Sequence, residues 1–113
     1  MKIDTIAPPP ESKVLFKWAS VKSIPEQSGC YIITTFDNDI LYVGLASNLN
    51  NRFKQHLSNP EKTNPTNDGK AIWFFFRNHD VKNLQQLERT WLNQFNDVHG
   101  RLPILNKVNS PIG

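Results

Sequence analysis

The sequence predicts a small α/β domain of the α+β type, in which a three-stranded, mostly antiparallel sheet is flanked by helices. β-Branched and aromatic residues form two runs within residues 30–43, and a strongly apolar run follows at residues 70–77. Apolar residues recur at helical spacing over residues 48–57 and 81–98. With 113 residues, of which 20% are charged, the chain has the size and composition of one globular domain.

The N-terminal residues are predicted to form an untethered arm and a short helix, together residues 1–23. Three consecutive prolines beginning at Pro8 favour an extended, polyproline-like conformation in the arm. The short helix is predicted from about residue 13 onwards. The main domain then extends over residues 24–107, and residues 108–113 form a C-terminal tail.

The first two apolar runs are predicted to form a β-hairpin with strands at residues 30–36 and 40–43. Asp and Asn residues between the strands favour a turn, because they tolerate positive φ. A register that sets Thr35 opposite Tyr42 leaves Tyr31 and Tyr42 on the same face of the sheet, since side chains alternate. A slip of one residue would separate the two tyrosines.

The remaining elements follow in order along the chain. Ser47 is the predicted N-cap of a helix over residues 48–57, and residues 59–69 are rich in Asn, Pro and Thr and are predicted to be a loop. The apolar run at residues 70–77 is predicted to be a central strand covered on both faces. A long helix over residues 81–98 completes the domain.

Glu88 interrupts the apolar stripe of the last helix. The stripe is formed by Val81, Leu84, Leu87, Trp91 and Phe95. An α-helix turns by about 100° per residue, and on this basis the Glu88 side chain points in the middle of the directions taken by the stripe residues. A carboxylate there is costly to bury unless it is paired. Two interpretations follow: a salt bridge or a slightly rotated helix, and a metal ligand or acid–base group.

Arg52 and His56 form a second polar pair beside an apolar stripe. They lie four residues apart, on one face of the helix over residues 48–57 and at the shoulder of its stripe. They are either two ordinary exposed residues or part of a phosphate site. Arginine donates two parallel hydrogen bonds to phosphate, and histidine can move protons near neutral pH.

The net charge of +3 is small, but positive residues gather in two segments that contain no acid. Residues 45–60 carry Arg52 and Lys54, and residues 98–113 carry Arg101 and Lys107. Such segments can face a nucleic-acid backbone even when the total charge is low.

The sequence also bears on the cellular location of the protein. Cys30 is the single cysteine, so an internal disulfide is impossible, and no run of eighteen apolar residues exists. The first thirteen residues lack the apolar core of a signal peptide. The expectation is an intracellular, cytoplasmic protein with no membrane segment.

Taken together, the order and spacing of these residues resemble the GIY-YIG nuclease domain over residues 24–107. The first motif reads Gly29-Cys30-Tyr31 and the second Tyr42-Val43-Gly44, followed by Arg52, His56, Glu88 and Asn106. The first motif has Cys in place of Ile. Leu45 stands where family members often carry Lys or Gln, so a substrate contact or alternative base at that position is missing.

The resemblance implies hydrolysis of a phosphodiester with one Mg²⁺ or Mn²⁺ ion, held by Glu88. Tyr31 would contact the attacking water or act as general base, and Tyr42 would orient the nucleophile or the phosphate. Arg52 would stabilise the charge that grows on the phosphate oxygens. His56 would assist proton transfer, and the general base is either Tyr31 or His56.

Asn106 would lie at the edge of the site and orient a partner. If the resemblance holds, Glu88, Arg52 and both tyrosine hydroxyls should converge in one cleft of about 10 Å. Binding to DNA would involve the basic residues Arg52, Lys54, Arg101 and Lys107.

The predicted function is therefore a metal-dependent DNA endonuclease that cuts one strand per active site with weak sequence specificity. The alternatives are a catalytically silent nucleic-acid-binding module of the same fold and a protein-interaction scaffold. The sequence does not decide between a monomer and a weak homodimer.

Overall fold

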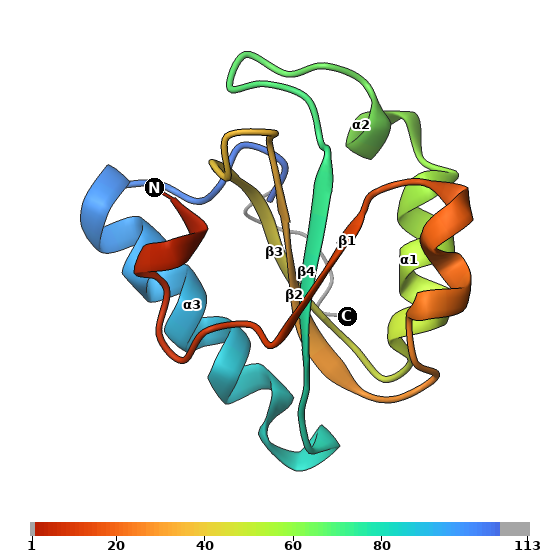
Figure 1. The fold of residues 1–113 in the computed structure, drawn as a ribbon. Coiled ribbons are helices and arrows are strands. Elements are labelled where there is room, and N and C mark those ends of the chain that lie inside the picture. The colour runs from red at the N-terminus through yellow and green to blue at the C-terminus, as the bar shows by residue number, and fades with distance from the viewer. Residues whose placement is uncertain (1, 107–113) are drawn as a thin grey trace.

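A computed structural model describes residues 2–106 of the chain; Lys107 and the predicted tail at 108–113 lie outside the described residues. It contains a four-stranded antiparallel sheet in the order β1-β4-β2-β3 (Figure 1). The strands are β1 (Ser12–Leu15), β2 (Gly29–Thr34), β3 (Ile40–Ala46) and β4 (Trp73–Asn78). The α+β class is confirmed, and the sheet has one strand more than predicted.

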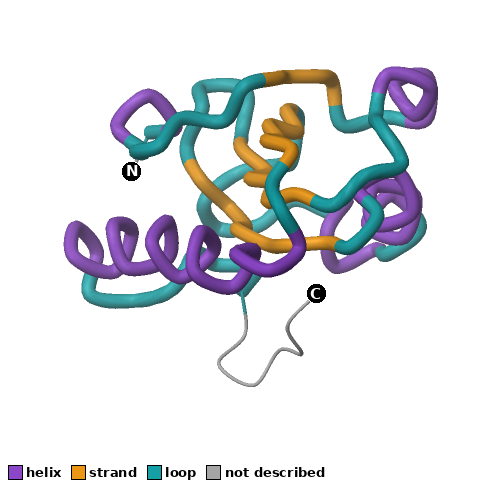
Figure 2. Tube along the Cα trace, turned by 90° about the horizontal axis from the view of Figure 1, so that it is seen from below, coloured by secondary structure: helices purple, strands orange, loops and turns teal. Residues whose placement is uncertain are grey.

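Helices cover both faces of the sheet. One face carries α3 (Leu84–His99) and the short 3-10 helix η1 (Ile3–Thr5), and the other carries α1 (Leu49–Leu57) with the 3-10 helix η2 (Trp18–Ser23). Seen from below, the strands lie between long α3 on one side and the α1 group on the other (Figure 2). Among residues 2–106, no helix is long and apolar enough to span a membrane.

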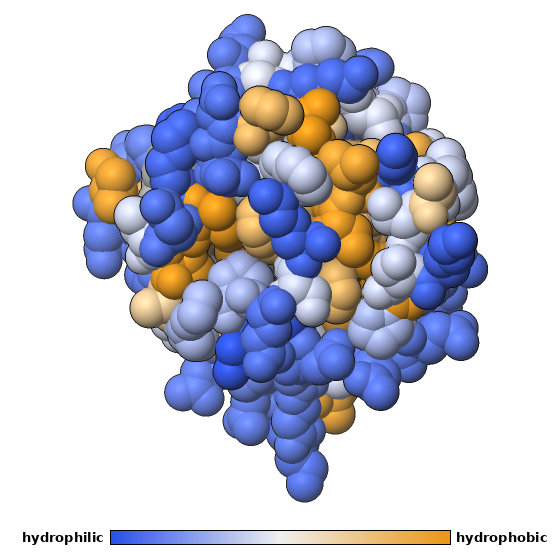
Figure 3. Space-filling view, viewed as in Figure 1, coloured by the Kyte–Doolittle hydropathy of each residue, from blue (hydrophilic) through white to orange (hydrophobic). Residues whose placement is uncertain are grey.

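The additional strand replaces the start of the predicted N-terminal helix. Val14 lies opposite Phe74 and Leu15 opposite Trp73, so this segment pairs with β4 and only residues 18–23 turn helically. The sheet partner therefore overrides the local helical spacing. Figure 3 shows apolar residues near the centre of the face on which β1 lies. Leu15, on β1, is one of the exposed large apolar residues of the described chain.

The N-terminal residues are packed against α3, contrary to the predicted untethered arm. Ile3 and Ile6 are buried in the core beneath α3. The backbone of Ala7 exchanges two hydrogen bonds with the side chain of Gln94, and Trp91 Nε1 donates to the carbonyl oxygen of Pro8 at 2.8 Å. This segment therefore completes the core on the α3 face. The domain boundaries at residues 23 and 107 remain predictions.

The hairpin register differs from the predicted one by two residues. Tyr42 lies opposite Ile33 instead of Thr35, β2 ends at Thr34, and the register shifts between Ile33 and Thr34. Because the difference is an even number of residues, each side chain keeps its face. The prediction that Tyr31 and Tyr42 share a face is confirmed by their rings, which stack at 5.9 Å.

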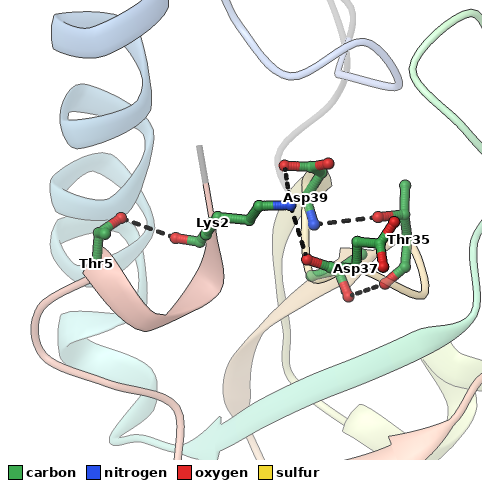
Figure 4. A network of polar contacts seen from close by, with 6 residues as sticks. Lys2, Thr5, Thr35, Asp37 and Asp39 are labelled. Atoms are coloured by element: carbon green, nitrogen blue, oxygen red, sulfur yellow. Dashed lines mark hydrogen bonds and ion pairs between the residues drawn. The ribbon is translucent and has the colours of Figure 1, made fainter.

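The hairpin turn explains why β2 ends earlier than predicted, whereas β3 runs three residues beyond its predicted end, to Ala46. Thr35 N donates to Asp39 O at 2.9 Å, and Asn38 takes the positive φ of 69° that the turn requires. Lys2 fastens the turn to the N-terminal segment, through an ion pair with Asp39 at 3.1 Å and a hydrogen bond to the carbonyl oxygen of Asp37 (Figure 4). These contacts remove residues 35–39 from the strand ladder.

Both main helices begin one to three residues later than predicted. Asn48, rather than Ser47, caps α1 by accepting a hydrogen bond from Asn51 N. Residues 81–83 form a 3-10 turn before α3, so Val81 is exposed instead of contributing to the buried stripe. The predicted loop at 59–69 contains a further short helix, α2 (Pro60–Thr63). β4 is central, as predicted.

Candidate active site

Strand β3 forms one edge of the sheet, and two predicted site residues bond to its free side. Asn106 Nδ2 donates to Val43 O at 2.8 Å, and Val43 N donates to Asn106 Oδ1 at 2.9 Å. Two residues further along the strand, Arg52 Nη1 donates to Leu45 O at 3.4 Å. Asn106 thus satisfies the exposed backbone of an edge strand. Arg52 lies beside the same edge and also acts on Tyr31 through its charge and a side-chain hydrogen bond.

The two motif tyrosines lie side by side on the α1 face next to this edge. Tyr31 is fully buried, and its ring stacks between Phe74 at 5.1 Å and Tyr42 at 5.9 Å between centroids. Tyr42, on the edge strand, is only half-buried. Tyr42 is therefore the member of the pair that faces the surface.

Both motif glycines allow close approaches that a side chain would prevent. A Cβ at Gly44 would lie 2.5 Å from Tyr31 Oη and 2.8 Å from Tyr42 Cε2. A Cβ at Gly29 would lie 2.3 Å from the carbonyl oxygen of Arg77 on β4. The Tyr31 hydroxyl thus lies directly over Gly44, which explains why the second motif ends in glycine.

Gly44→Ala is expected to displace Tyr31 and to lower the free energy of unfolding by about 1–3 kcal/mol, because the added methyl group overpacks the core. Urea denaturation measures the loss, and NMR measures the shift of the Tyr31 and His56 resonances. Gly100→Ala is the comparison for the resonances alone, since a Cβ there meets nothing within 4 Å and should leave them in place, while its φ of 68° makes that substitution destabilising in its own right. An unchanged urea midpoint for Gly44→Ala would contradict the packing described here.

His56 completes the aromatic cluster from α1. Its side chain is buried, and its Nε2 lies 2.5 Å from Tyr31 Oη, within hydrogen-bond distance. Burial, and secondarily the charges of Lys62 and Arg52, lower the pKa of His56 to about 3. The imidazole is therefore neutral at physiological pH and carries one nitrogen that can accept a proton.

The tyrosines are held in their neutral form. Burial and the neighbouring Tyr42 raise the pKa of Tyr31 well above its ordinary value, and Arg52 opposes this. Burial raises the pKa of Tyr42 as well, the adjacent Tyr31 hydroxyl lowers it, and the charge of Glu88 raises it. The cluster therefore holds protonated hydroxyls beside a neutral imidazole at neutral pH.

Glu88 belongs to the helix that covers the opposite face of the sheet from this cluster. It lies on α3, whereas Arg52 and His56 lie on α1 (Figure 1). Its charge nevertheless affects both Tyr42 and the buried thiol of Cys30, whose pKa rises to about 12, mainly through burial. The structure thus brings Arg52, His56 and both tyrosines together on the α1 face. Glu88 lies on the helix of the other face and acts on Tyr42 through its charge, so its convergence with the others in one cleft stays a prediction.

The Glu88 carboxylate is half-buried and lacks a counter-ion within the described residues 2–106. No Lys, Arg or His nitrogen of this part of the chain lies within 4.0 Å of it, so the salt-bridge interpretation is wrong for these residues. Burial raises the pKa of Glu88, and Arg89 partly opposes the shift. An uncompensated, half-buried carboxylate is costly for the fold and points to a role outside folding.

The other predicted basic residues lie apart from the tyrosine cluster or outside the described residues. Lys54 is exposed on α1. Arg101 bonds to Asp68 at 3.1 Å and lies over the Phe95 ring, and it borders a pocket of about 610 Å³ that Asn106 also lines. Lys107 lies outside the described residues.

Sequence reasoning missed Lys62. Its side chain is buried, and its Nζ lies 4.9 Å from the centroid of the Tyr42 ring. The signal was present in residues 59–61, since Asn59 caps α2 by accepting a hydrogen bond from Glu61 N, and Pro60 occupies the first turn. This short helix places a lysine beside the cluster.

Comparison with known proteins agrees with this geometry. Residues 27–101 match the model of the GIY-YIG catalytic domain. Because the match covers more than half of the chain, the chain belongs to the GIY-YIG catalytic domain family.

The chain is also similar to short parts of several proteins named UvrABC system protein C. It is 34% identical to that of Mycoplasma genitalium over 77 residues, which is 66% of this chain and 13% of the relative. It is 38% identical to that of Carboxydothermus hydrogenoformans over 48 residues, or 42% of this chain and 8% of the relative. The Prochlorococcus marinus protein is 34% identical over 55 residues, 49% of this chain and 8% of the relative. The chain thus matches about a tenth of the length of these relatives.

Proposed function

We propose that this chain is a DNA endonuclease domain that requires a divalent cation, hydrolyses one phosphodiester bond per active site and has weak sequence specificity. The observation that carries the proposal is the hydrogen-bonded Tyr31–His56 pair, buried over Gly44 and beside the guanidinium of Arg52. Membership of the GIY-YIG family supports nuclease chemistry for this arrangement.

Arg52 is suited to bind the phosphate. Among residues 2–106 no carboxylate lies within 4.0 Å of its guanidinium, so its charge is available beside the β3 edge. Guanidinium groups bind phosphate oxygens through parallel hydrogen bonds and stabilise charge that develops on them. Asn106 keeps the edge strand, and with it Tyr42, in place.

The Tyr31–His56 pair is suited to take up the proton of the attacking water. A proton that arrives at the Tyr31 oxygen is balanced by transfer of the hydroxyl proton to His56 Nε2, 2.5 Å away. The neutral imidazole has a lone pair on Nε2 for this proton, and its low pKa makes it a weak base that returns the proton readily. Either member of the pair could therefore contact the water first.

The residues present fit a weakly held divalent cation. Magnesium favours oxygen ligands and is often held by one or two carboxylates together with water and substrate phosphates. Glu88 supplies one half-buried carboxylate, and the described residues contain no cluster of three or more His, Cys, Asp and Glu side chains. Glu88 would hold the cation, which when bound would offset negative charge at the phosphate and acidify water.

Weak specificity is consistent with the way the N-terminal segment is held. Contacts to Gln94, Trp91 and the hairpin turn fasten it against α3, so it is not a free arm that could enter a DNA groove.

Nicking of supercoiled plasmid by the purified protein tests the proposal. We expect relaxed circles with Mg²⁺ and none with EDTA, and a loss of about 100–1,000-fold for Arg52→Ala. Lys82→Ala, which changes an exposed lysine next to α3, is the matched control and should cleave like wild type. Absent cleavage with retained binding to branched or single-stranded DNA would indicate a silent module. Absence of both would favour a protein-interaction scaffold.

A further inference from the structure

We propose that Lys62 is a positioning residue of this active site, which holds the Tyr42 ring and sets the charge around His56 from the short helix α2. The inference rests on the proposed function, because it concerns the same cluster.

The first observation is the burial of a charged side chain. The Lys62 side chain is only 8% exposed, which is unusual for a lysine. Its ammonium lies over the face of the Tyr42 ring, at a distance typical of a cation–π contact. A desolvated cation–π contact is among the stronger ones, so this contact restrains the orientation of the tyrosine on the edge strand.

The second observation is that the local sequence delivers Lys62 to this place. Asn59 N donates to His56 O at the end of α1, and Lys62 N donates to Asn59 O. The chain therefore reverses within a few residues of His56. This reversal places Lys62 near His56, the α1 residue that contacts Tyr31. The short helix α2 holds the backbone of Lys62 in this position.

The third observation concerns the groups that face His56. They are Tyr31 from β2, Tyr42 from β3, Arg52 from its own helix and Lys62 from α2. Burial is the main cause of the low His56 pKa, and Lys62 contributes more than Arg52. Lys62 thereby adds to the effect of burial in opposing protonation of His56.

Lys62→Met tests the inference, with Lys62→Arg as the conservative variant. We expect the His56 pKa, measured by NMR titration of the ring nitrogens, to rise in Lys62→Met and to stay low in Lys62→Arg. On DNA, Lys62→Met should lower kcat between about 10-fold and 100-fold with little change in KM, because Tyr42 loses its support. The acidic limb of the pH–rate profile should move to higher pH, and Lys62→Arg should restore most of kcat.

The matched control is Lys82→Met, which removes one exposed lysine and should change neither readout. If Lys62→Met does not fold, Lys62→Gln serves the same comparison. An unchanged His56 pKa in the folded variant would overturn the inference, and so would a kcat loss that Lys62→Arg does not restore. If wild type itself does not cleave DNA, the proposed function fails, while the NMR titration still decides whether Lys62 acts on His56.

Discussion

Glu88→Gln is expected to reduce cleavage by at least about 100-fold and to leave the fold as stable as before, or more stable. Cleavage falls because the amide cannot supply the anionic oxygen that a divalent cation requires. Stability is preserved because the carboxylate is half-buried and has no ion-pair partner among residues 2–106, so the fold loses an uncompensated charge. Loss of activity without loss of stability separates a site residue from a structural one.

The effect of Glu88 on stability has a definite pH dependence. Burial raises its pKa in the folded state above the unfolded value, so protonation is easier in the folded protein. The associated stabilisation is present at pH values below the unfolded pKa and is lost as pH rises through the folded pKa. Glu88→Gln should therefore gain stability over wild type at neutral pH and lose this advantage in acid.

Urea denaturation at several pH values measures the stability effect, and plasmid nicking measures activity. Glu26→Gln, which changes an exposed carboxylate, is the control and should follow wild type in both experiments. Cleavage at the wild-type rate by Glu88→Gln would exclude a role for this carboxylate in catalysis. A marked loss of stability at neutral pH would instead indicate that Glu88 has a structural partner.

The alternation of side chains along strands and the spacing of apolar residues along helices were sufficient to predict on which face of the strand or helix the candidate site residues lie. Tyr31 and Tyr42 share a face although the predicted register was wrong, because an error of two residues preserves alternation. The position of Glu88 within an apolar stripe correctly indicated a half-buried carboxylate. Such patterns are local, so they survive errors in the positions of turns and helix ends.

Contacts between distant segments could not be predicted in this way. β1 is a strand because it pairs with β4, about sixty residues further along the chain, and its own sequence also suits a helix. The side chains of Trp91 and Gln94 hold the N-terminal segment by hydrogen bonds to its backbone. Every sequence has such backbone groups, so these contacts leave no signal in the sequence of the segment. Lys62 was missed because a four-residue helix is too short to show a periodic pattern.

Tyr31→Phe and His56→Gln are each expected to lower the cleavage rate by about 100-fold to 10,000-fold, and the double variant should be no slower than the worse single one. Proton uptake needs both the hydroxyl and the Nε2 that faces it at 2.5 Å, so removing either abolishes the same step. Each change should also lower the free energy of unfolding by about 1 kcal/mol, because a buried hydrogen bond is lost.

Thr34→Val separates the two effects, because it removes another fully buried hydroxyl, which lies at the end of β2 and donates to Thr35 O at 3.0 Å. It should lose comparable stability and retain full cleavage. Single-turnover rates for the four members of the Tyr31–His56 cycle then decide whether the residues act as one unit. Multiplying losses in the double variant would show that they act in separate steps. Coinciding losses, with Thr34→Val fully active, would identify this pair as the route by which the proton leaves the attacking water.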